Sequence, residues 1–192
     1  MKFDEQYTQP KGHLEIYKVF PDGNYTLFYS DSNVVCSGMG VTLAEAFAAD
    51  LDSPVTEFQI SLFQIGTAGL PGLQVSSNGR LGNSLSLAEY STGSLELVTQ
   101  SMIASGTVYA SEVFGVIPSS FVDKVGATKV RWRILVDRNV GNGLVLNEIG
   151  LFSKNPSQLT PTATSYLCAY RNFSDLTKTS EFSLDVRWTI EF

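Results

Sequence analysis

The sequence predicts an all-β protein: an antiparallel, jelly-roll-like β-sandwich with one short peripheral helix and a long loop or arm. Short segments of alternating apolar and polar residues recur along the chain, turn-forming residues separate them, and a helix signal occurs once. Alternation of period two is typical of strands with one buried face, because successive side chains of a strand point to opposite sides. We expect eight or nine strands. No internal repeat or linker interrupts the pattern, so residues 1–192 are expected to form a single domain.

The clearest strand is predicted over residues 181–192. Apolar side chains occupy every second position there, and the positions between them are polar or charged. A helix would distribute these apolar residues around its surface, whereas a strand places them on one face. We therefore expect a structural core strand whose buried face consists of Phe182, Leu184, Val186, Trp188, Ile190 and Phe192.

A hairpin is predicted at the start of the sandwich. The segments 14–20 and 25–29 have strand composition, and Pro21-Asp22-Gly23-Asn24 between them favours a tight turn. The polar residues 31–33 are expected to end the second strand. Further strands are predicted over residues 58–62, 107–117, 127–136, 144–152 and 165–170.

One helix is predicted after this hairpin. Thr42-Leu-Ala-Glu45 fits a capping box, in which the threonine hydroxyl accepts a hydrogen bond from the third helical amide and the glutamate reaches back to the cap. The alanine-rich residues that follow favour a helix, and residues 50–54 are expected to end it. The helix should therefore begin at Thr42 and extend over about two and a half turns.

The segment 64–94 predicts a loop or arm outside the sandwich. It is rich in Gly, Ser and Asn, and loops of this length in compact domains are usually functional. Its scattered apolar residues would be poorly sheltered in a lone subunit. We therefore expect an assembly arm that docks on a neighbouring subunit through Leu70, Leu73, Val75, Leu81, Leu85 and Leu87.

The composition argues against two classes of partner. The net charge is −6 and the pI is about 4.7, whereas proteins that grip nucleic acid need a basic face. Lys129, Arg131 and Arg133 alternate along one predicted strand, which favours a solvated face. No apolar run reaches the roughly 20 residues of a membrane span, and a secretion signal is not expected. Only 17% of the residues are charged and 11% are aromatic, which favours burial of some surface in a homo-oligomer.

No residue pattern in the sequence predicts an active site. His13 is the single histidine and is expected on the surface, without the Cys or His neighbours of a zinc site. Asp137, Asn139 and Asn142 miss the spacing of a calcium loop and predict an Asx-rich turn. Cys36 and Cys168 are expected as buried free thiols. We accordingly predict no catalytic residue, no metal and no cofactor.

Several carboxylates could in principle act as a glycosidase pair, but the sequence does not pair them. Glu148 stands out because it interrupts an apolar strand. We expect it to point outward or to pair with Arg171 or Lys178 of a neighbouring strand. The other candidates are Glu57, Glu89, Glu96 and Glu112.

The chain resembles a family of structural proteins of tailed bacteriophages: the small β-sandwich proteins, and N-terminal domains of tail-collar and tail-fibre proteins, that attach appendages to the virion. The resemblance covers about residues 33–192 with gaps. The stretches that resemble the family are Asn33-Val-Val, Gly38-Met-Gly-Val-Thr-Leu-Ala-Glu45, Asn147-Glu-Ile-Gly-Leu-Phe152, Ala169-Tyr-Arg-Asn-Phe173, Lys178-Thr-Ser-Glu-Phe182 and Trp188-Thr-Ile-Glu-Phe192.

The resemblance implies a non-enzymatic structural component of a phage particle, associated with the tail as a collar, baseplate or fibre-attachment protein. It implies other virion proteins as partners, a symmetric homo-oligomer, and location in the virion after assembly in the host cytoplasm. It defines no catalytic residues. A capsid decoration protein is the second interpretation, and a carbohydrate-binding sandwich that stacks sugars on loop aromatics such as Tyr90 is the third.

Overall fold

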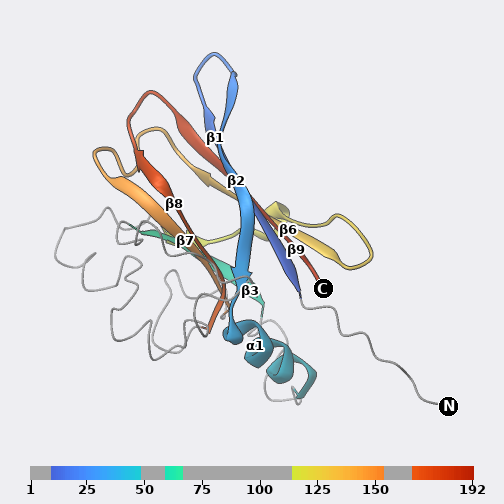
Figure 1. The fold of residues 1–192 in the computed structure, drawn as a ribbon. Helices are drawn as coiled ribbons and strands as arrows, with labels where there is room; N and C mark the ends of the chain where they lie inside the picture. The colour runs from blue at the N-terminus through green and yellow to red at the C-terminus, as the bar shows by residue number, and fades with distance from the viewer. Residues whose placement is uncertain (1–9, 49–58, 67–113, 154–165) are drawn as a thin grey trace.

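The computed structural model describes residues 10–48, 59–66, 114–153 and 166–192. Within these ranges the chain forms an all-β sandwich of nine strands with one α-helix, and every strand pair is antiparallel (Figure 1). The elements are β1 (Lys11–Val19), β2 (Tyr25–Val35), α1 (Ser37–Ala48), β3 (Ile60–Gly66), β4 (Phe114–Val116), the 3₁₀ turn η2 (Ser119–Phe121), β5 (Val122–Lys124), β6 (Lys129–Val136), β7 (Val145–Ser153), β8 (Tyr166–Thr177) and β9 (Ser183–Glu191).

The strands form two layers that share β2. The order of neighbours is β4-β3-β7-β8-β2-β1-β9-β6-β5. Sheet A contains β5, β6, β9, β1 and most of β2, which pairs with β1 from Tyr25 to Asn33. Sheet B contains β4, β3, β7, β8 and the last two residues of β2, Val34 and Val35, which pair with β8. The chain therefore passes from one layer to the other within a single strand.

The last four strands form a folded antiparallel ribbon. β6 pairs with β9 in sheet A, and β7 and β8 between them pair with each other in sheet B. The pair β7–β8 is thus nested in sequence between the two strands of the pair β6–β9, and the pairs lie in different layers. Jelly rolls are built from strand pairs nested in this way. This arrangement agrees with the jelly-roll-like topology predicted from the sequence.

The core lies between the two sheets. Trp132 of β6 and Trp188 of β9 are directly opposite each other in the ladder, and both are almost completely buried. The indole nitrogen of Trp132 donates a 2.9 Å hydrogen bond to the carbonyl oxygen of Ile60 in sheet B. Trp132 therefore joins the layers by a polar contact as well as by packing. Sheet B contributes Phe63, Ile65, Ile149, Leu151, Ala169, Phe173 and Leu176 to this core.

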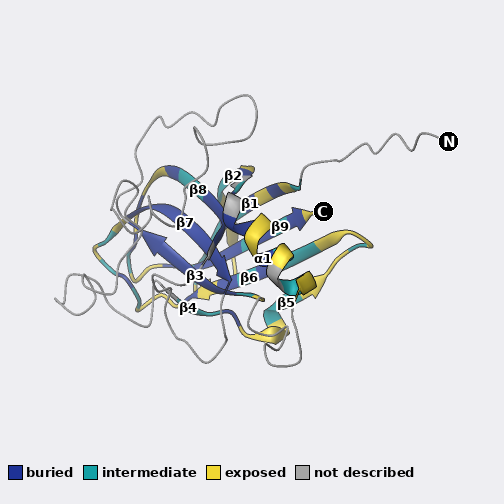
Figure 2. Cartoon of the chain, turned by 90° about the horizontal axis from the view of Figure 1, so that it is seen from below, coloured by how far each residue is buried: buried dark blue, intermediate teal, exposed yellow. Residues whose placement is uncertain are grey.

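Sheet B is buried more deeply than sheet A. Every residue of β3 after Ile60 and every residue of β7 after Val145 is buried, so both faces of these strands lie away from solvent. β1 and β6 instead alternate between buried and more exposed positions. Figure 2 shows this difference as dark blue over most of β3 and β7. The more exposed sheet face of the described chain is therefore the outer face of sheet A.

β9 has the predicted alternation, with two differences. Phe182, Leu184, Val186, Trp188 and Ile190 are buried, but Phe192 follows the end of the strand and is 39% exposed. Its amide donates a hydrogen bond to the carbonyl oxygen of Thr128, and its side chain does not extend the buried row. The expectation that Phe192 completes the core face is therefore wrong. Asp185, on the supposedly polar face, is fully buried.

Two strands are longer than expected. The polar residues 31–33 continue the ladder of β2 with β1, because Ser30 and Ser32 face Glu15 and His13 across an exposed sheet surface. The expectation that residues 31–33 end the strand is wrong. β8 likewise extends to Thr177, where it pairs with Val145. In both strands an exposed face allows polar residues, so apolar alternation fades before the hydrogen-bonded ladder ends.

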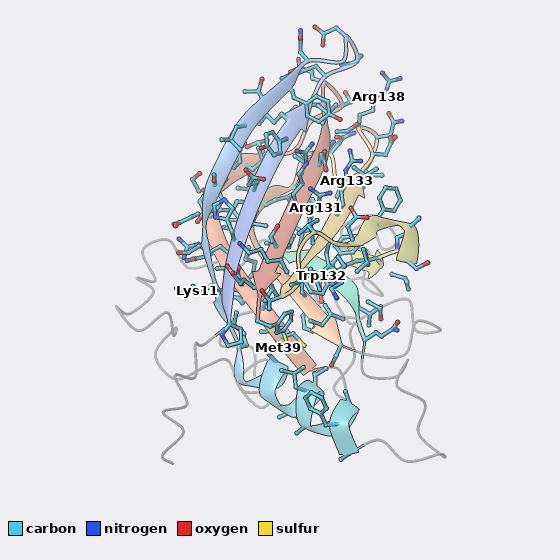
Figure 3. All side chains as sticks on the ribbon, turned by 90° about the vertical axis from the view of Figure 1, so that its right-hand side faces the viewer. Lys11, Met39, Arg131, Trp132, Arg133 and Arg138 are labelled. Atoms are coloured by element: carbon cyan, nitrogen blue, oxygen red, sulfur yellow. The ribbon has the colours of Figure 1, made fainter. Side chains whose placement is uncertain are left out.

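The helix begins earlier than the capping box indicates. α1 starts at Ser37, directly after β2, so Thr42 lies inside the helix rather than at its cap. The Thr42 hydroxyl donates to the carbonyl oxygen of Gly38 at 2.8 Å and lies 2.9 Å from the Ser153 hydroxyl. The capping-box assignment is therefore wrong, because Thr42 anchors the helix to sheet B instead. Met39 marks the buried side of α1 (Figure 3).

The predicted assembly arm, residues 64–94, lies outside the described residues beyond Gly66. The same holds for most of the strand predicted over residues 107–117, of which β4 is the described part. The apolar arm residues Leu70, Leu73, Val75, Leu81, Leu85 and Leu87 all fall in this range, and their role stays a prediction.

Replacing Trp188 by alanine should lower the free energy of unfolding by about 3–5 kcal/mol, because it opens a cavity beside Trp132. Thr189→Ala is the matched control, since Thr189 is the next residue of β9 and faces away from the core. We expect it to cost less than about 1 kcal/mol. Urea unfolding followed by circular dichroism measures both changes, and equal losses would contradict the assigned facing of β9.

Candidate functional site

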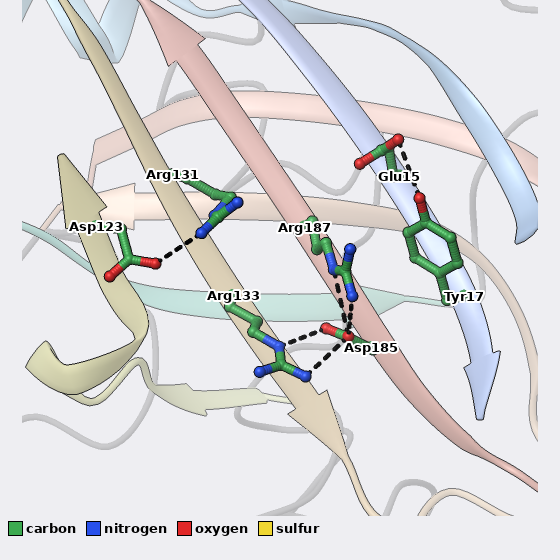
Figure 4. A network of polar contacts seen from close by, with 7 residues as sticks. All are labelled: Glu15, Tyr17, Asp123, Arg131, Arg133, Asp185 and Arg187. Atoms are coloured by element: carbon green, nitrogen blue, oxygen red, sulfur yellow. Dashed lines mark hydrogen bonds and ion pairs between the residues drawn. The ribbon is translucent and has the colours of Figure 1, made fainter. Parts of the chain in front are cut away.

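A cluster of charged and aromatic side chains lies on the outer face of sheet A, centred on Asp185. We call it the Asp185 cluster: Asp185 and Arg187 of β9, Arg133 of β6, Tyr17 of β1 and Tyr25 of β2. Arg133 binds both oxygens of Asp185 through Nε and Nη2, each at 2.9 Å. Arg187 binds Oδ2 of Asp185 through Nε at 3.3 Å and Nη2 at 3.0 Å (Figure 4).

The strand register produces this arrangement. Arg133 and Arg187 are directly opposite each other, and Asp185 lies two residues from Arg187 on the same face of β9. Asp185 is fully buried, while the side chains of Arg133 and Arg187 are 36% and 33% exposed. Hydrogen bonding to Asp185 raises the pKa of Arg133 above its already high ordinary value. The two guanidinium groups therefore cover the carboxylate and present the surface of the cluster to solvent.

Two tyrosines fix Arg187 from the side. Its guanidinium lies 4.7 Å from the ring centre of Tyr17 and 5.9 Å from that of Tyr25, within the range of cation–π attraction. The Tyr17 hydroxyl donates to Glu15 at 3.1 Å. Because four hydrogen bonds occupy the oxygens of Asp185, the carboxylate holds the two arginine side chains in one arrangement.

Apolar side chains and ion pairs surround the cluster. Leu27 and Leu135 beside the cluster, and Tyr25 within it, are each 51% exposed, although they lie in strands rather than in loops. Arg131 pairs with Asp123 at 2.9 Å, and Lys129 pairs with Glu191 at 3.1 Å. The solvated face predicted for Lys129, Arg131 and Arg133 is thus present, but each cation is matched by a carboxylate. Tyrosine, arginine and leucine side chains of this kind are typical of protein interfaces.

A second polar cluster lies in sheet B around Glu148. This carboxylate is fully buried and accepts a 2.9 Å hydrogen bond from the hydroxyl of Tyr170. It lies over Gly66, whose missing side chain leaves the space that Glu148 occupies. Burial and the nearby Glu148 carboxylate raise the pKa of Tyr170.

The expectation for Glu148 is therefore wrong on both of its alternatives. Glu148 does not point outward, and the two proposed partners bind elsewhere. Arg171 pairs with Asp31 and donates to the Tyr29 hydroxyl at 2.5 Å. The Lys178 ammonium donates to the carbonyl oxygens of Arg138 at 3.0 Å and Thr179 at 2.8 Å, and to Asn142 Oδ1 at 3.3 Å. Glycine opposite glutamate in the ladder makes this burial possible.

The remaining sequence candidates have structural roles. His13 is exposed on β1, where its Nε2 lies 3.2 Å from the Ser30 hydroxyl on an open sheet surface. Asp137 accepts a 2.9 Å hydrogen bond from the amide of Asn139, as expected for an Asx turn. In the described ranges, no group of three or more His, Cys, Asp or Glu residues could hold a metal ion. Those ranges also contain no helix with the length and apolar character of a membrane span.

The two cysteines are buried and are not joined in a disulfide, as predicted. The amide of Cys36 donates to the carbonyl oxygen of Cys168 at 2.9 Å, so the pair extends the ladder of β2 with β8 by one residue. Burial raises the pKa of the Cys168 thiol to about 11, and burial raises that of Cys36 as well. A raised thiol pKa makes these cysteines poor nucleophiles at neutral pH.

The Asp185 cluster was not predicted from the sequence. Its usable signal was an aspartate in the middle of the strongest alternating strand, with an arginine two residues later on the same face. A comparison with protein-family models and searches of curated proteins and of solved structures find no match for this chain. The function is therefore inferred from the chain's own residues and from its resemblance to tailed-phage proteins.

Replacing Asp185 by asparagine should lower the free energy of unfolding by about 3–5 kcal/mol, because it leaves two guanidinium groups without their shared, buried counter-charge. The control is Asp123→Asn, which removes one partner of the exposed pair with Arg131. Exposed pairs contribute about 0–1 kcal/mol. Chemical unfolding of both variants measures the difference, and a small effect of Asp185→Asn would contradict the central place of the carboxylate.

Gly66→Ala should destabilise the fold by about 1–3 kcal/mol, as overpacking of a filled core does. The new Cβ would lie within 2.8 Å of three Glu148 side-chain atoms, so the buried carboxylate must move. Gly115→Ala in the neighbouring strand is the matched control, because its Cβ would meet only Phe63 at an ordinary 3.7 Å. Thermal melting of the two variants is the measurement. A neutral Gly66→Ala would show that Glu148 has room to rearrange.

Proposed function

We propose that this protein is a non-enzymatic structural component of a tailed-bacteriophage particle, associated with the tail as a collar, baseplate or fibre-attachment protein. The observation that supports the proposal is spatial. The stretches that resemble the phage proteins are separated in the sequence, yet many of their residues are neighbours in the fold. If the resemblance had arisen by chance, its stretches would not be expected to be neighbours in the fold.

The connected unit is built around β8. Val34 and Val35 of the first stretch pair with Tyr170 and Ala169 of β8. β7, which contains the stretch 147–152, pairs with the other side of β8. Gly38 lies against the backbone of Leu167, where an added side chain would collide with the carbonyl group, so α1 also packs here. The resembling residues thus support one another physically.

The polar groups of the described chain favour a scaffold over a catalyst. Asp185 and Glu148 are buried and hydrogen-bonded, and the Lys178 ammonium is held by three oxygen atoms. Groups held in this way fix the fold, because each would leave unsatisfied partners if it moved. The low charged fraction, 17% of the chain, favours a protein that buries surface against other subunits.

The proposal is tested by locating the chain in phage particles produced by the genome that encodes it. Particles are purified, heads and tails are separated, and each fraction is analysed by quantitative mass spectrometry. We expect the chain in the tail fraction at a fixed number of copies per particle, with labelled antibodies binding there in electron micrographs.

The same experiment distinguishes the alternatives. Recovery in the head fraction would replace the tail assignment by capsid decoration. Absence from particles whose other structural proteins are all recovered would refute a virion role.

A further inference from the structure

The outer face of sheet A has a geometry that suits pairing with itself. β9 is the middle strand of the five strands in this sheet, with β1 and β2 on one side and β6 and β5 on the other. A two-fold axis that lies in the surface of the sheet and runs along β9 would place β1 of one copy over β6 of the second. We infer that this face binds the same face of a second copy of the chain about such an axis.

The charges on the face are complementary under this rotation. Glu15, Arg187 and Arg133 lie side by side at one level of the sheet, on β1, β9 and β6. The rotation exchanges the outer two positions. Glu15 of each copy therefore faces Arg133 of the other, and the interface contains this opposite-charge pair twice. An isologous contact needs this kind of self-complementarity.

The apolar residues are complementary at the next level. Tyr17, Asp185 and Leu135 lie side by side there, and Leu27 lies beyond Tyr17 on β2. The rotation places Leu135 of one copy against Tyr17 and Leu27 of the other. Leu27 and Leu135 are each 51% exposed in the lone chain, so the contact would remove both from water.

The charges at the centre of the face are balanced, so two copies can approach each other along the axis. On the axis, Arg187 of one copy faces Arg187 of the other, and the two like charges would repel. Arg187 and Arg133 share the buried Asp185, however, and Glu15 lies directly beside Arg187. These four groups have no net charge. Arg187 is also held between Asp185 and the ring of Tyr17, so little side-chain freedom would be lost on docking.

The size of the face predicts a dimer of modest strength. Five strands spaced at about 4.8 Å span roughly 20 Å, and eight residues extend about 27 Å, which gives a footprint of about 500 Å² per copy. The total buried area of about 1,000 Å² lies at the lower limit for a specific interface. Sheets that pack face to face cross at about 30°, so the axis should lie within about 15° of β9.

This inference rests on the proposed assembly role only for its biological use. Self-association is measured with the purified chain, and the virion role is measured in particles. If the purified chain is monomeric but is found in tails, only the dimer inference is overturned. If the purified chain dimerises but is absent from particles, only the virion role is overturned.

The test is sedimentation equilibrium of the purified full-length chain between about 1 μM and 1 mM, a range that brackets the affinity of a small interface. We expect a reversible monomer–dimer equilibrium. Leu135→Glu and Leu27→Lys, made singly, should each weaken dimerisation at least tenfold, because each buries an unpaired charge. The variant with both substitutions should regain at least half of the lost affinity, since the two new, opposite charges lie on neighbouring strand positions across the axis.

Val145→Glu is the control, because it adds the same charge to an exposed apolar residue in sheet B. It should leave dimerisation unchanged, and thermal melting should show that all variants are folded. Three results would each overturn the inference: a monomer throughout the concentration range, a dimer that Leu135→Glu does not weaken, or a double variant no stronger than the single ones.

Discussion

The fold depends on the pairing of β9 with two strands at once. β1 flanks it from Ser183 to Glu191 and β6 flanks it from Leu184 to Glu191, so its backbone hydrogen bonds are satisfied on both sides. Since the side chains alternate, a slip of one residue would turn Trp188 outward and bring Arg187 into the core. The apolar row and the neighbouring strands therefore specify one register between them, and the Asp185 cluster exists only in that register.

Burial of Asp185 explains why the outer face of sheet A is ordered despite its exposure. A lone buried carboxylate would be strongly unfavourable, and Arg133 and Arg187 compensate by covering it with four hydrogen bonds. The Arg187 guanidinium in turn packs against the rings of Tyr17 and Tyr25. Preorganised side chains lose little entropy when another surface docks on them, which is how this cluster would favour the proposed assembly role.

The sequence predicted those parts of the fold in which one side of a strand is apolar, such as β9, β6 and the hairpin of β1 with β2. It failed where pairing rather than burial continues a strand, at residues 31–33 of β2 and in the second half of β8. Capping chemistry misplaced the helix, because Thr42 has the same hydroxyl whether it caps α1 or anchors it to Ser153. The Asp185 and Glu148 clusters need cross-strand register, which local patterns do not contain.

One strand, β2, belongs to both layers of the sandwich. Its segment from Tyr25 to Asn33 pairs with β1 in sheet A, and Val34 and Val35 pair with β8 in sheet B. The layers are therefore joined by continuous backbone as well as by side-chain packing. Either sheet can open fully only if β2 gives up part of its ladder. Amide hydrogen exchange in β1 and β8 should accordingly report one cooperative opening event, with the sandwich behaving as a single mechanical unit.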